Sequence, residues 1–291
     1  DRSLSRVRYY VGKRVGGSPA GMGWEAQAVS LVPKERLYEA LNRTIDHEIA
    51  MAAGAGPKPK SVGEVMDGWK KVGHQSGSNP GGLYQDTSGK KWYVKFPKSV
   101  DHAKNELLAS KLYGLAGIET PELKLVNDDG NVGIASAFTE GLQTDKEALQ
   151  EGAAEGAREG FGTDAWLANW DSVGLVYDNM LLDQDGKAVR IDPGGSLLYR
   201  AQGSPKGAAF GNTVTEIDSL RDPKVNAQAA SVFGNMTEAD LKASVAPVLA
   251  IPQESIRKTV MECGPGGEKE REALADKLIA RQKDLAQRFG K

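Results

Sequence analysis

The spacing of apolar residues first indicates a helix near the start of the chain. Apolar side chains recur every four positions over 33–52, which is typical of one buried helix face. They are Leu37, Leu41, Ile45 and Ile49. Residues 1–30 are rich in glycine, serine and arginine, and we expect an irregular arm there. The Gly- and Pro-rich stretch 54–60 predicts a linker, so an N-terminal segment, 1–60, precedes the rest of the chain.

Strand patterns dominate the region after this linker. Following a short predicted helix over 62–69, runs of aromatic and β-branched residues alternate with turn residues, which favours strands. The strands are expected near 72–75, 83–86, 91–96, 123–126 and 132–138, with a helix inserted over 101–116. The sequence therefore predicts a small, mostly antiparallel sheet with one helix over 61–141.

Helical spacing returns in the second half of the chain, 142–291. We expect a helix over 145–170, a β-hairpin of 179–182 with 188–191, and mainly helices from about 215 onward. The last helix, 269–289, carries a buried face. Its apolar residues are Leu274, Leu278, Leu285 and Phe289. Strands followed by a run of helices predict an α+β fold.

Composition and charge exclude several classes of protein. The 291 residues include 37 basic and 39 acidic side chains, for a net charge of −2, without the basic block of a nucleic-acid binder. No run of 18 apolar residues occurs, so no membrane span is predicted. The single cysteine, Cys263, excludes a disulfide framework. With no signal-peptide pattern at the start, a cytoplasmic protein is expected, and delivery into another cell stays open.

Glycine is in clear excess. The chain has 35 glycines among its 291 residues, whereas the usual frequency of about 7% would give roughly 20. One glycine-rich turn lies between two predicted strands and consists of Gly77, Ser78, Asn79, Pro80, Gly81 and Gly82. Such a turn lets backbone N–H groups approach phosphate oxygens. A plain hairpin turn is the alternative. The segment is not a Walker A motif, because no Gly-Lys-Ser/Thr follows it.

A lysine on a predicted strand is the second candidate for chemistry. Lys95 lies in Trp92-Tyr-Val-Lys-Phe96, flanked by apolar residues, so its ammonium is expected to point at a specific partner. Glu106 on the following helix is a suitable partner, since an ion pair would hold the lysine against a phosphate. A solvent-exposed lysine on an edge strand is the alternative.

Acidic and amide side chains around the predicted hairpin form the third candidate. Asn179 follows Asp171 by eight residues, and Asp192 is followed by Pro-Gly-Gly. A strand that ends in Asp before glycines presents a carboxylate to a metal, and Asn179 adds a neutral oxygen ligand. Asp171 is then available to orient or deprotonate a hydroxyl. Caps of local turns are the alternative for Asp171 and Asn179.

Taken in their order along the chain, the three features resemble the motifs of the protein-kinase-like fold. The resemblance is to its atypical branch, which holds HipA-like toxins, phosphoinositide-kinase-like enzymes and bacterial effector kinases, and it covers about residues 70–203. It implies a two-lobed α+β fold, with an antiparallel-sheet N-lobe and a mainly helical C-lobe, that uses ATP and Mg²⁺. By the same resemblance, the glycine-rich turn covers ATP. Residues 137–142, including Phe138 and Glu140, become the hinge that meets adenine.

The resemblance also implies a role for each candidate side chain. Lys95 would contact the ATP phosphates, and Glu106 would hold it in place. Asp171 would be the catalytic base, while Asn179 and Asp192 would bind Mg²⁺. The function implied is an ATP- and Mg²⁺-dependent phosphotransferase.

Several positions depart from the usual kinase pattern. The Asp-to-Asn interval is three residues longer than in H-R-D-x-x-x-x-N, no His stands beside Asp171, and Pro-Gly-Gly follows Asp192. The longer interval leaves Asp178 and Asp164 as alternative bases. We prefer Asp171, because Asp178 would point away from its neighbour Asn179 in an extended chain.

The acceptor is the part of the function that the motifs specify least. A protein Ser or Thr is favoured over a lipid, since no basic cluster near 204–211 would attract an anionic membrane surface. A nucleotide-binding pseudokinase scaffold and a kinase-fold AMP transferase are the alternatives. Arg200, which follows the Gly-Gly pair, is expected to touch phosphate or substrate, or to anchor its loop to an acid. The sequence does not predict the oligomeric state.

Overall fold

The computed structural model describes residues 6–15, 23–33, 62–75 and 79–290. The chain divides into two compact units, residues 1–60 and 61–291. The predicted linker over 54–60 lies outside the described residues, and so does the predicted helix over 33–52 apart from its first residue.

In the first unit, strands β1 (Arg6–Val15) and β2 (Gly23–Pro33) pair as an antiparallel hairpin, so the irregular arm expected over 1–30 was wrong. Basic and apolar residues alternate over Arg6–Tyr9, and Tyr10 and Val11 continue the aromatic and β-branched run, which favours a strand. The glycine and serine content of the segment obscured that alternation.

The second unit begins with a six-stranded sheet in the order β3-β7-β8-β6-β5-β4. Every neighbouring pair is antiparallel except β3 with β7. The strands are β3 (Glu64–Val65), β4 (Lys70–Lys71), β5 (Gly81–Gln85), β6 (Lys91–Lys95), β7 (Leu123–Asp128) and β8 (Asn131–Ala137). The predicted small, mostly antiparallel sheet is confirmed.

Two local predictions in this sheet were wrong. The segment 62–69 was expected to be a helix, but it contains strand β3 instead. Glu64 and Val65 pair with Val126 and Asn127, about sixty residues further along the chain. The strand expected at 72–75 is replaced by β4 at residues 70–71. In both places long-range pairing overrides the local pattern.

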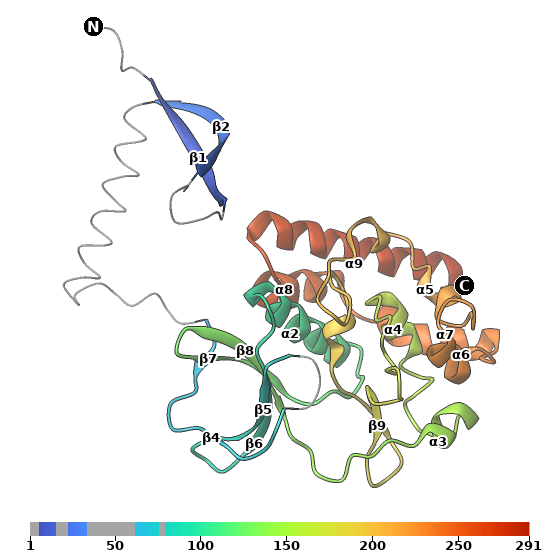
Figure 1. Ribbon diagram of the computed structural model, residues 1–291. Coiled ribbons are helices and arrows are strands. Elements are labelled where there is room, and N and C mark those ends of the chain that lie inside the picture. The colour runs from blue at the N-terminus through green and yellow to red at the C-terminus, as the bar shows by residue number, and fades with distance from the viewer. Residues whose placement is uncertain (1–5, 16–22, 34–61, 76–78, 291) are drawn as a thin grey trace, which may run out of the picture. The chain divides into compact units, whose positions relative to one another are not determined.

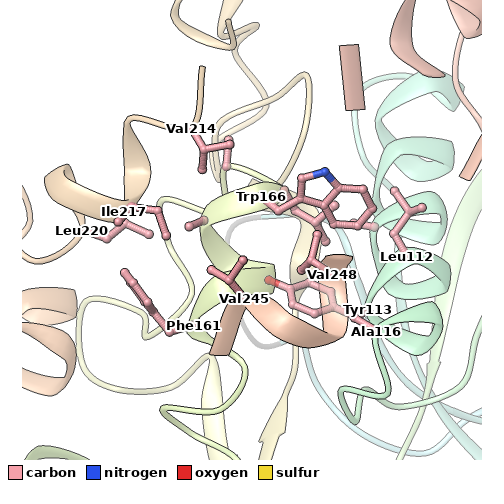
Figure 2. Packing of buried hydrophobic residues seen from close by; sticks show 14 of the residues in the cluster. Leu112, Tyr113, Ala116, Phe161, Trp166, Val214, Ile217, Leu220, Val245 and Val248 are labelled. Carbon is pink, nitrogen blue, oxygen red and sulfur yellow. The ribbon is translucent and has the colours of Figure 1, made fainter. Parts of the chain in front are cut away.

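Helix α2 (Val100–Leu115) links the sheet to the helices that follow (Figure 1). Ser99 caps its first turn by accepting a hydrogen bond from the His102 N–H, as expected of an N-cap serine. The first half of α2 packs on the sheet, where buried Ala103 meets Ile134. Its second half joins the main hydrophobic core through Leu112 and Tyr113 (Figure 2).

The rest of the unit is helical apart from a short hairpin, and we call it the helical lobe (Figure 1). The hairpin strands are β9 (Met180–Leu182) and β10 (Ala188–Arg190). The α-helices are α3 (Lys146–Glu151), α4 (Phe161–Trp166), α5 (Glu216–Ser219), α6 (Ala227–Phe233), α7 (Glu238–Leu249), α8 (Gln253–Cys263) and α9 (Glu268–Phe289). Two short 3-10 turns are η1 (Pro193–Gly195) and η2 (Gly207–Ala209). The predicted hairpin and the helical C-terminal part are confirmed.

The main core of the helical lobe surrounds α4 (Figure 2). Trp166 is fully buried there and donates from its indole nitrogen to the Leu278 carbonyl of α9 at 2.9 Å.

The continuous helix expected over 145–170 was wrong, because α3 stops at Gly152, which adopts a left-handed conformation with φ of 76°. In the described part of the chain, no helix combines the length and the apolar composition needed to cross a bilayer.

Candidate active site

Lys95 lies at the centre of a buried charge cluster between the sheet and the helical lobe. Its ammonium nitrogen is 2.8 Å from Glu106 Oε1 and 2.7 Å from Asp192 Oδ1. Lys95 ends strand β6, Glu106 lies on the buried face of α2, and Asp192 follows strand β10. The structure thus brings three sequence-predicted residues from three separate elements into direct contact.

The protonation behaviour of this cluster reflects burial and mutual charge. Burial raises the pKa of Glu106 to about 7, an effect that Lys95 opposes and Asp192 reinforces. Burial acts to lower the pKa of Lys95, but the charges of Glu106 and Asp192 prevail and the pKa is raised. The Asp192 side chain is half exposed. Burial acts to raise its pKa as well, and the contact with Lys95 lowers it overall. The lysine therefore stays charged while one carboxylate beside it remains accessible.

The β9–β10 hairpin brings Asn179 next to Asp192. The Ile191 N–H donates to the Asn179 carbonyl at 2.9 Å, so the residue before β9 pairs with the residue before Asp192. The Asn179 side-chain nitrogen donates to the backbone carbonyl of Asp171 at 2.8 Å and to Asp171 Oδ2 at 3.0 Å. Asp171, Asn179 and Asp192 consequently occupy one site, although 21 residues separate the first from the last.

Asp171 itself is partly buried at the edge of this site. Burial raises the pKa of its carboxyl group, the Asn179 hydrogen bond lowers it, and the nearby charges of Asp192 and Asp178 raise it further. The net effect is a pKa raised above the ordinary value of an aspartate.

The glycine-rich turn lies partly outside the described residues, which exclude Gly77 and Ser78. Asn79 and Pro80 lead into β5, and the Phe96 N–H donates to the Pro80 carbonyl. Gly81 and Gly82 were expected in the turn, but they form the start of β5. Gly81 pairs with Lys95 at a φ of 154°, and a Cβ there would meet the Val94 carbonyl oxygen. Glycine is thus needed where this strand approaches the lysine strand.

The predicted hinge follows β8. The Phe138 N–H donates to the Lys91 carbonyl at 3.0 Å, and the Phe138 side chain is largely exposed. Glu140 is also exposed, and it forms an ion pair with the Lys91 side chain at 2.9 Å. The role of these residues as a hinge that meets adenine stays a prediction.

One alternative base, Asp164, lies in the core instead of the site. Arg190 donates to both of its carboxylate oxygens, at 2.7 and 2.8 Å, and the Tyr113 hydroxyl donates to it at 2.7 Å. Asp164 is fully buried and Arg190 almost so, which leaves no access for an acceptor hydroxyl. The other alternative base, Asp178, is exposed near the site.

Lys206 is a site residue that sequence reasoning missed. It is 4% exposed, and its ammonium donates to the carbonyls of Ala168 and Gly195, both at 2.7 Å. These carbonyls belong to the segments that carry Asp171 and Asp192, so one buried lysine ties both segments together. Backbone carbonyls leave no sequence signature, and only the unusual burial of Lys206 identifies the contact.

The pH dependence of stability offers a test of this buried lysine. Burial lowers the pKa of Lys206 from 10.5 to about 7, since Glu216 compensates only in part and Arg281 and Arg200 add positive charge. Between these pH values the unfolded chain binds the extra proton, so stability rises with pH across that window. We expect the free energy of unfolding of the wild type, relative to Lys206→Met, to rise by about 2 kcal/mol from pH 7 to pH 9. Urea unfolding at both pH values measures it, and a constant difference would contradict it.

The donor set of the site suits a hard cation such as Mg²⁺. Asp192 offers an accessible carboxylate, and Asn179 uses its side-chain nitrogen for Asp171, which leaves the amide oxygen available. Mg²⁺ takes oxygen ligands, often one or two protein groups together with water and substrate phosphates. Among the described residues, no group of three or more His, Cys, Asp or Glu side chains forms a metal site on its own. The two residues would therefore hold Mg²⁺ jointly with a nucleotide.

Comparison by sequence yields no relatives. No protein-family model matches the chain, and no curated protein matches its sequence.

Comparison with solved structures does find similar folds. The chain is similar to the proinflammatory kinase CtkA of Helicobacter pylori, with a TM-score of 0.51 and 14% identity over 75% of this chain and 94% of that chain. An aminoglycoside phosphotransferase from Alicyclobacillus acidocaldarius gives a TM-score of 0.34 at 9% identity, covering 80% of this chain and 96% of its own. The choline kinase LicA of Streptococcus pneumoniae gives 0.28 at 13% identity, covering 85% and 99%.

The likeness to CtkA concerns the fold alone, given the low identity. Together with the mixed sheet and the helical lobe, it confirms the expected two-lobed α+β fold of the atypical protein-kinase-like type. The HipA-like and phosphoinositide-kinase-like branches suggested by the sequence stay a prediction.

Proposed function

We propose that this chain is an ATP- and Mg²⁺-dependent phosphotransferase, and that it acts as an atypical protein Ser/Thr kinase. One observation carries the proposal: Lys95 lies 2.8 Å from Glu106 and 2.7 Å from Asp192, beside the hydrogen-bonded pair of Asn179 and Asp171. This arrangement unites a phosphate-binding cation, two oxygen ligands for a metal and a carboxylate in one place.

Each side chain has a separate role in the proposed reaction. Lys95, held by Glu106, binds the phosphates of ATP, and Asp192 with Asn179 holds Mg²⁺. Bound Mg²⁺ supplies positive charge that neutralises the phosphate oxygens. Catalysis in this class rests mainly on positioning and charge, which suits a site whose parts come from rigid elements.

Asp171 acts on the acceptor. It accepts a hydrogen bond from the acceptor hydroxyl and aligns that oxygen with the terminal phosphorus of ATP. The hydroxyl oxygen forms the new P–O bond as the bond to the β-phosphate oxygen breaks. ADP leaves, and the hydroxyl proton passes to Asp171. Asn179 keeps the Asp171 carboxylate in one orientation, because it donates to both the side chain and the backbone of that residue.

The acceptor we favour is a protein Ser or Thr. A pseudokinase scaffold would have no use for Asp171, Asn179 and Asp192 together, whereas an AMP transferase would use the same residues and differs in the group that it transfers. To test the proposal, the full chain is incubated with ATP, Mg²⁺ and a mixture of Ser- and Thr-containing peptides. The masses of both the chain and the peptides are then measured. A phosphoryl adduct on a peptide or on the chain supports it. An AMP adduct, or nucleotide binding without turnover, contradicts it in favour of one of the alternatives.

The Asp171→Asn variant tests the assignment of the base. We expect peptide phosphorylation to fall by about 10²- to 10⁴-fold, the range typical of a lost general base, while ATP affinity stays within about twofold. Nucleotide affinity and single-turnover phosphorylation are measured on the same samples. The matched control is Asp178→Asn, an exposed carboxylate seven residues away in sequence. If Asp178→Asn loses phosphorylation and Asp171→Asn retains it, the assignment is wrong.

A further inference from the structure

Two adjoining hollows lie on the acceptor side of Asp171. The first, about 220 Å³, is lined by Asp171 itself together with Leu175 and Val225. The second, about 370 Å³, is lined by Arg200, Thr215 and Ser219 among others. Trp170, Val225 and Asn226 line both hollows, so the two lie next to each other. Together they form what we call the acceptor groove, with Asp171 at one end and Arg200 at the other.

The walls of the acceptor groove are fixed by hydrogen bonds. The Asn226 side-chain nitrogen donates to the Trp170 carbonyl at 2.8 Å, and its oxygen accepts from the Ala229 N–H at 3.0 Å. The Trp170 indole nitrogen donates to Glu216 at 3.1 Å. The groove is therefore built before any acceptor arrives, as a specific binding site requires.

The Arg200 end of the acceptor groove carries uncompensated positive charge. The guanidinium carbon of Arg200 and the ammonium of Lys206 each lie 4.8 Å from the centre of the Trp170 ring. The nearby carboxylate of Glu216 is already engaged by Arg281 at 2.8 Å and by the Trp170 indole. Within the part of the chain that the structure describes, Arg200 forms no ion pair with a carboxylate.

The lining at the Asp171 end of the acceptor groove is apolar and unusually exposed. Leu175 is 75% exposed and Val225 is 66% exposed, and both line the hollow that contains Asp171. Val176, beside Leu175 in sequence, is 69% exposed. Large aliphatic side chains clustered at a candidate active site are typical of a surface that a partner covers.

We propose that the acceptor groove binds a polypeptide segment in which a Ser or Thr faces Asp171, an apolar residue covers Leu175 and Val225, and an Asp or Glu pairs with Arg200. This inference rests on the proposed function and specifies its substrate. Arg200 and the carboxylate would form a charge-assisted pair on the face of Trp170, with the planar geometry that guanidinium groups favour. Because Trp170 adjoins Asp171 in sequence, the acidic residue lies within a few positions of the acceptor hydroxyl.

Charge and shape favour this occupant over others. A cationic small acceptor would meet the repulsion of Arg200, which lies over the Trp170 ring. A lipid headgroup would require a wider basic surface, whereas the hollow at Arg200 is also lined by the acidic Glu216 and the uncharged Thr215. An extended polypeptide can place a hydroxyl, an apolar side chain and a carboxylate along one elongated groove.

A position-scanned peptide set tests the proposal with the full chain, ATP and Mg²⁺. Each peptide carries one serine, an apolar background, and a single glutamate or lysine at one of the four positions on either side. We expect glutamate at one position to raise kcat/KM by about five- to tenfold over lysine there, as suits a partly exposed ion pair. Arg200→Glu is expected to reverse that preference at the same position. Lys258→Glu, an equal charge change at an exposed site on α8, is expected to leave the preference intact.

A binding measurement separates failure of this inference from failure of the proposed function. The best acidic peptide, with its serine replaced by alanine and a fluorescent label attached, is titrated with wild type and Arg200→Glu. Arg200-dependent binding of this probe, without any ATP turnover, would support the acidic-peptide site and overturn the phosphotransferase. Phosphorylation without an acid preference, or a preference that survives Arg200→Glu, would overturn the acidic-peptide site. Turnover of ATP with no peptide bound or modified would also overturn the acidic-peptide site.

Discussion

Replacing Asp192 by alanine is expected to lower Mg²⁺-dependent phosphoryl transfer by about 10³-fold or more, equivalent to about 4 kcal/mol of transition-state stabilisation. The change removes the accessible carboxylate of the proposed metal site and one of the two partners of Lys95, which lies 2.7 Å away. Glu106 would still hold the lysine at 2.8 Å, so the site is expected to lose its metal without losing its lysine. Initial rates across a Mg²⁺ titration measure the effect.

The conformation of Asp192 calls for a second variant. Its backbone is left-handed, with φ of 51°, a conformation that asparagine tolerates better than alanine does. Asp192→Asn keeps the shape and removes the charge, so it is expected to show the same loss with less effect on stability. Asp185→Ala, an exposed aspartate in the β9–β10 turn, serves as the matched control. Undiminished turnover in folded Asp192→Ala and Asp192→Asn would overturn the assignment of Asp192 as a metal ligand.

Arg190→Met is expected to destabilise the fold by about 3–5 kcal/mol, because it leaves the carboxylate of Asp164 charged and unpaired in the core. Arg190 also donates to the carbonyls of Gly156 and Ala157, at 3.2 and 2.8 Å, and these lose their partner as well. Urea unfolding monitored by circular dichroism measures the loss.

Two comparisons make the Arg190 prediction specific. Arg257→Met breaks the ion pair with Asp276, which is just as short at 2.6 Å but lies on the surface, and it is expected to cost less than about 1 kcal/mol. The double variant Arg190→Met with Asp164→Leu removes both charges and is expected to recover much of the loss. Equal effects of the buried and exposed single variants would contradict our account of the core.

The sequence predicted those parts of the site that depend on short-range order. Lys95 and Glu106 lie on a strand and the next helix, only 11 residues apart, and the β9–β10 hairpin was readable from its Asp-Gln-Asp-Gly turn. A hairpin necessarily brings its two ends together, so the meeting of Asn179 with Asp192 followed from local patterns. The resemblance to kinases then suggested a role for each of these residues.

Contacts that depend on the tertiary fold could not be predicted. Strand β3 forms through pairing with β7, some sixty residues away, and two residues are too short a run to leave a pattern. The sequence around Asp164 does not distinguish it from a carboxylate of the site. Only its partners Tyr113 and Arg190, which are distant in sequence, identify it as a core residue. Lys206 binds backbone carbonyls, to which every residue type contributes alike.

Helix α2 limits how this protein can be regulated. Glu106 sits on a helix whose second half contributes Leu112 and Tyr113 to the main core, and its Asn105 exchanges hydrogen bonds with Ser196 and Leu198 of the helical lobe. Swinging this helix outward to separate Glu106 from Lys95 would pull Leu112 and Tyr113 out of the main core, and close-packed cores resist partial opening. An on–off control based on the position of α2 is therefore costly in this architecture. If Asp171 is the base, as we propose, access of the acceptor to it is the less costly point of control.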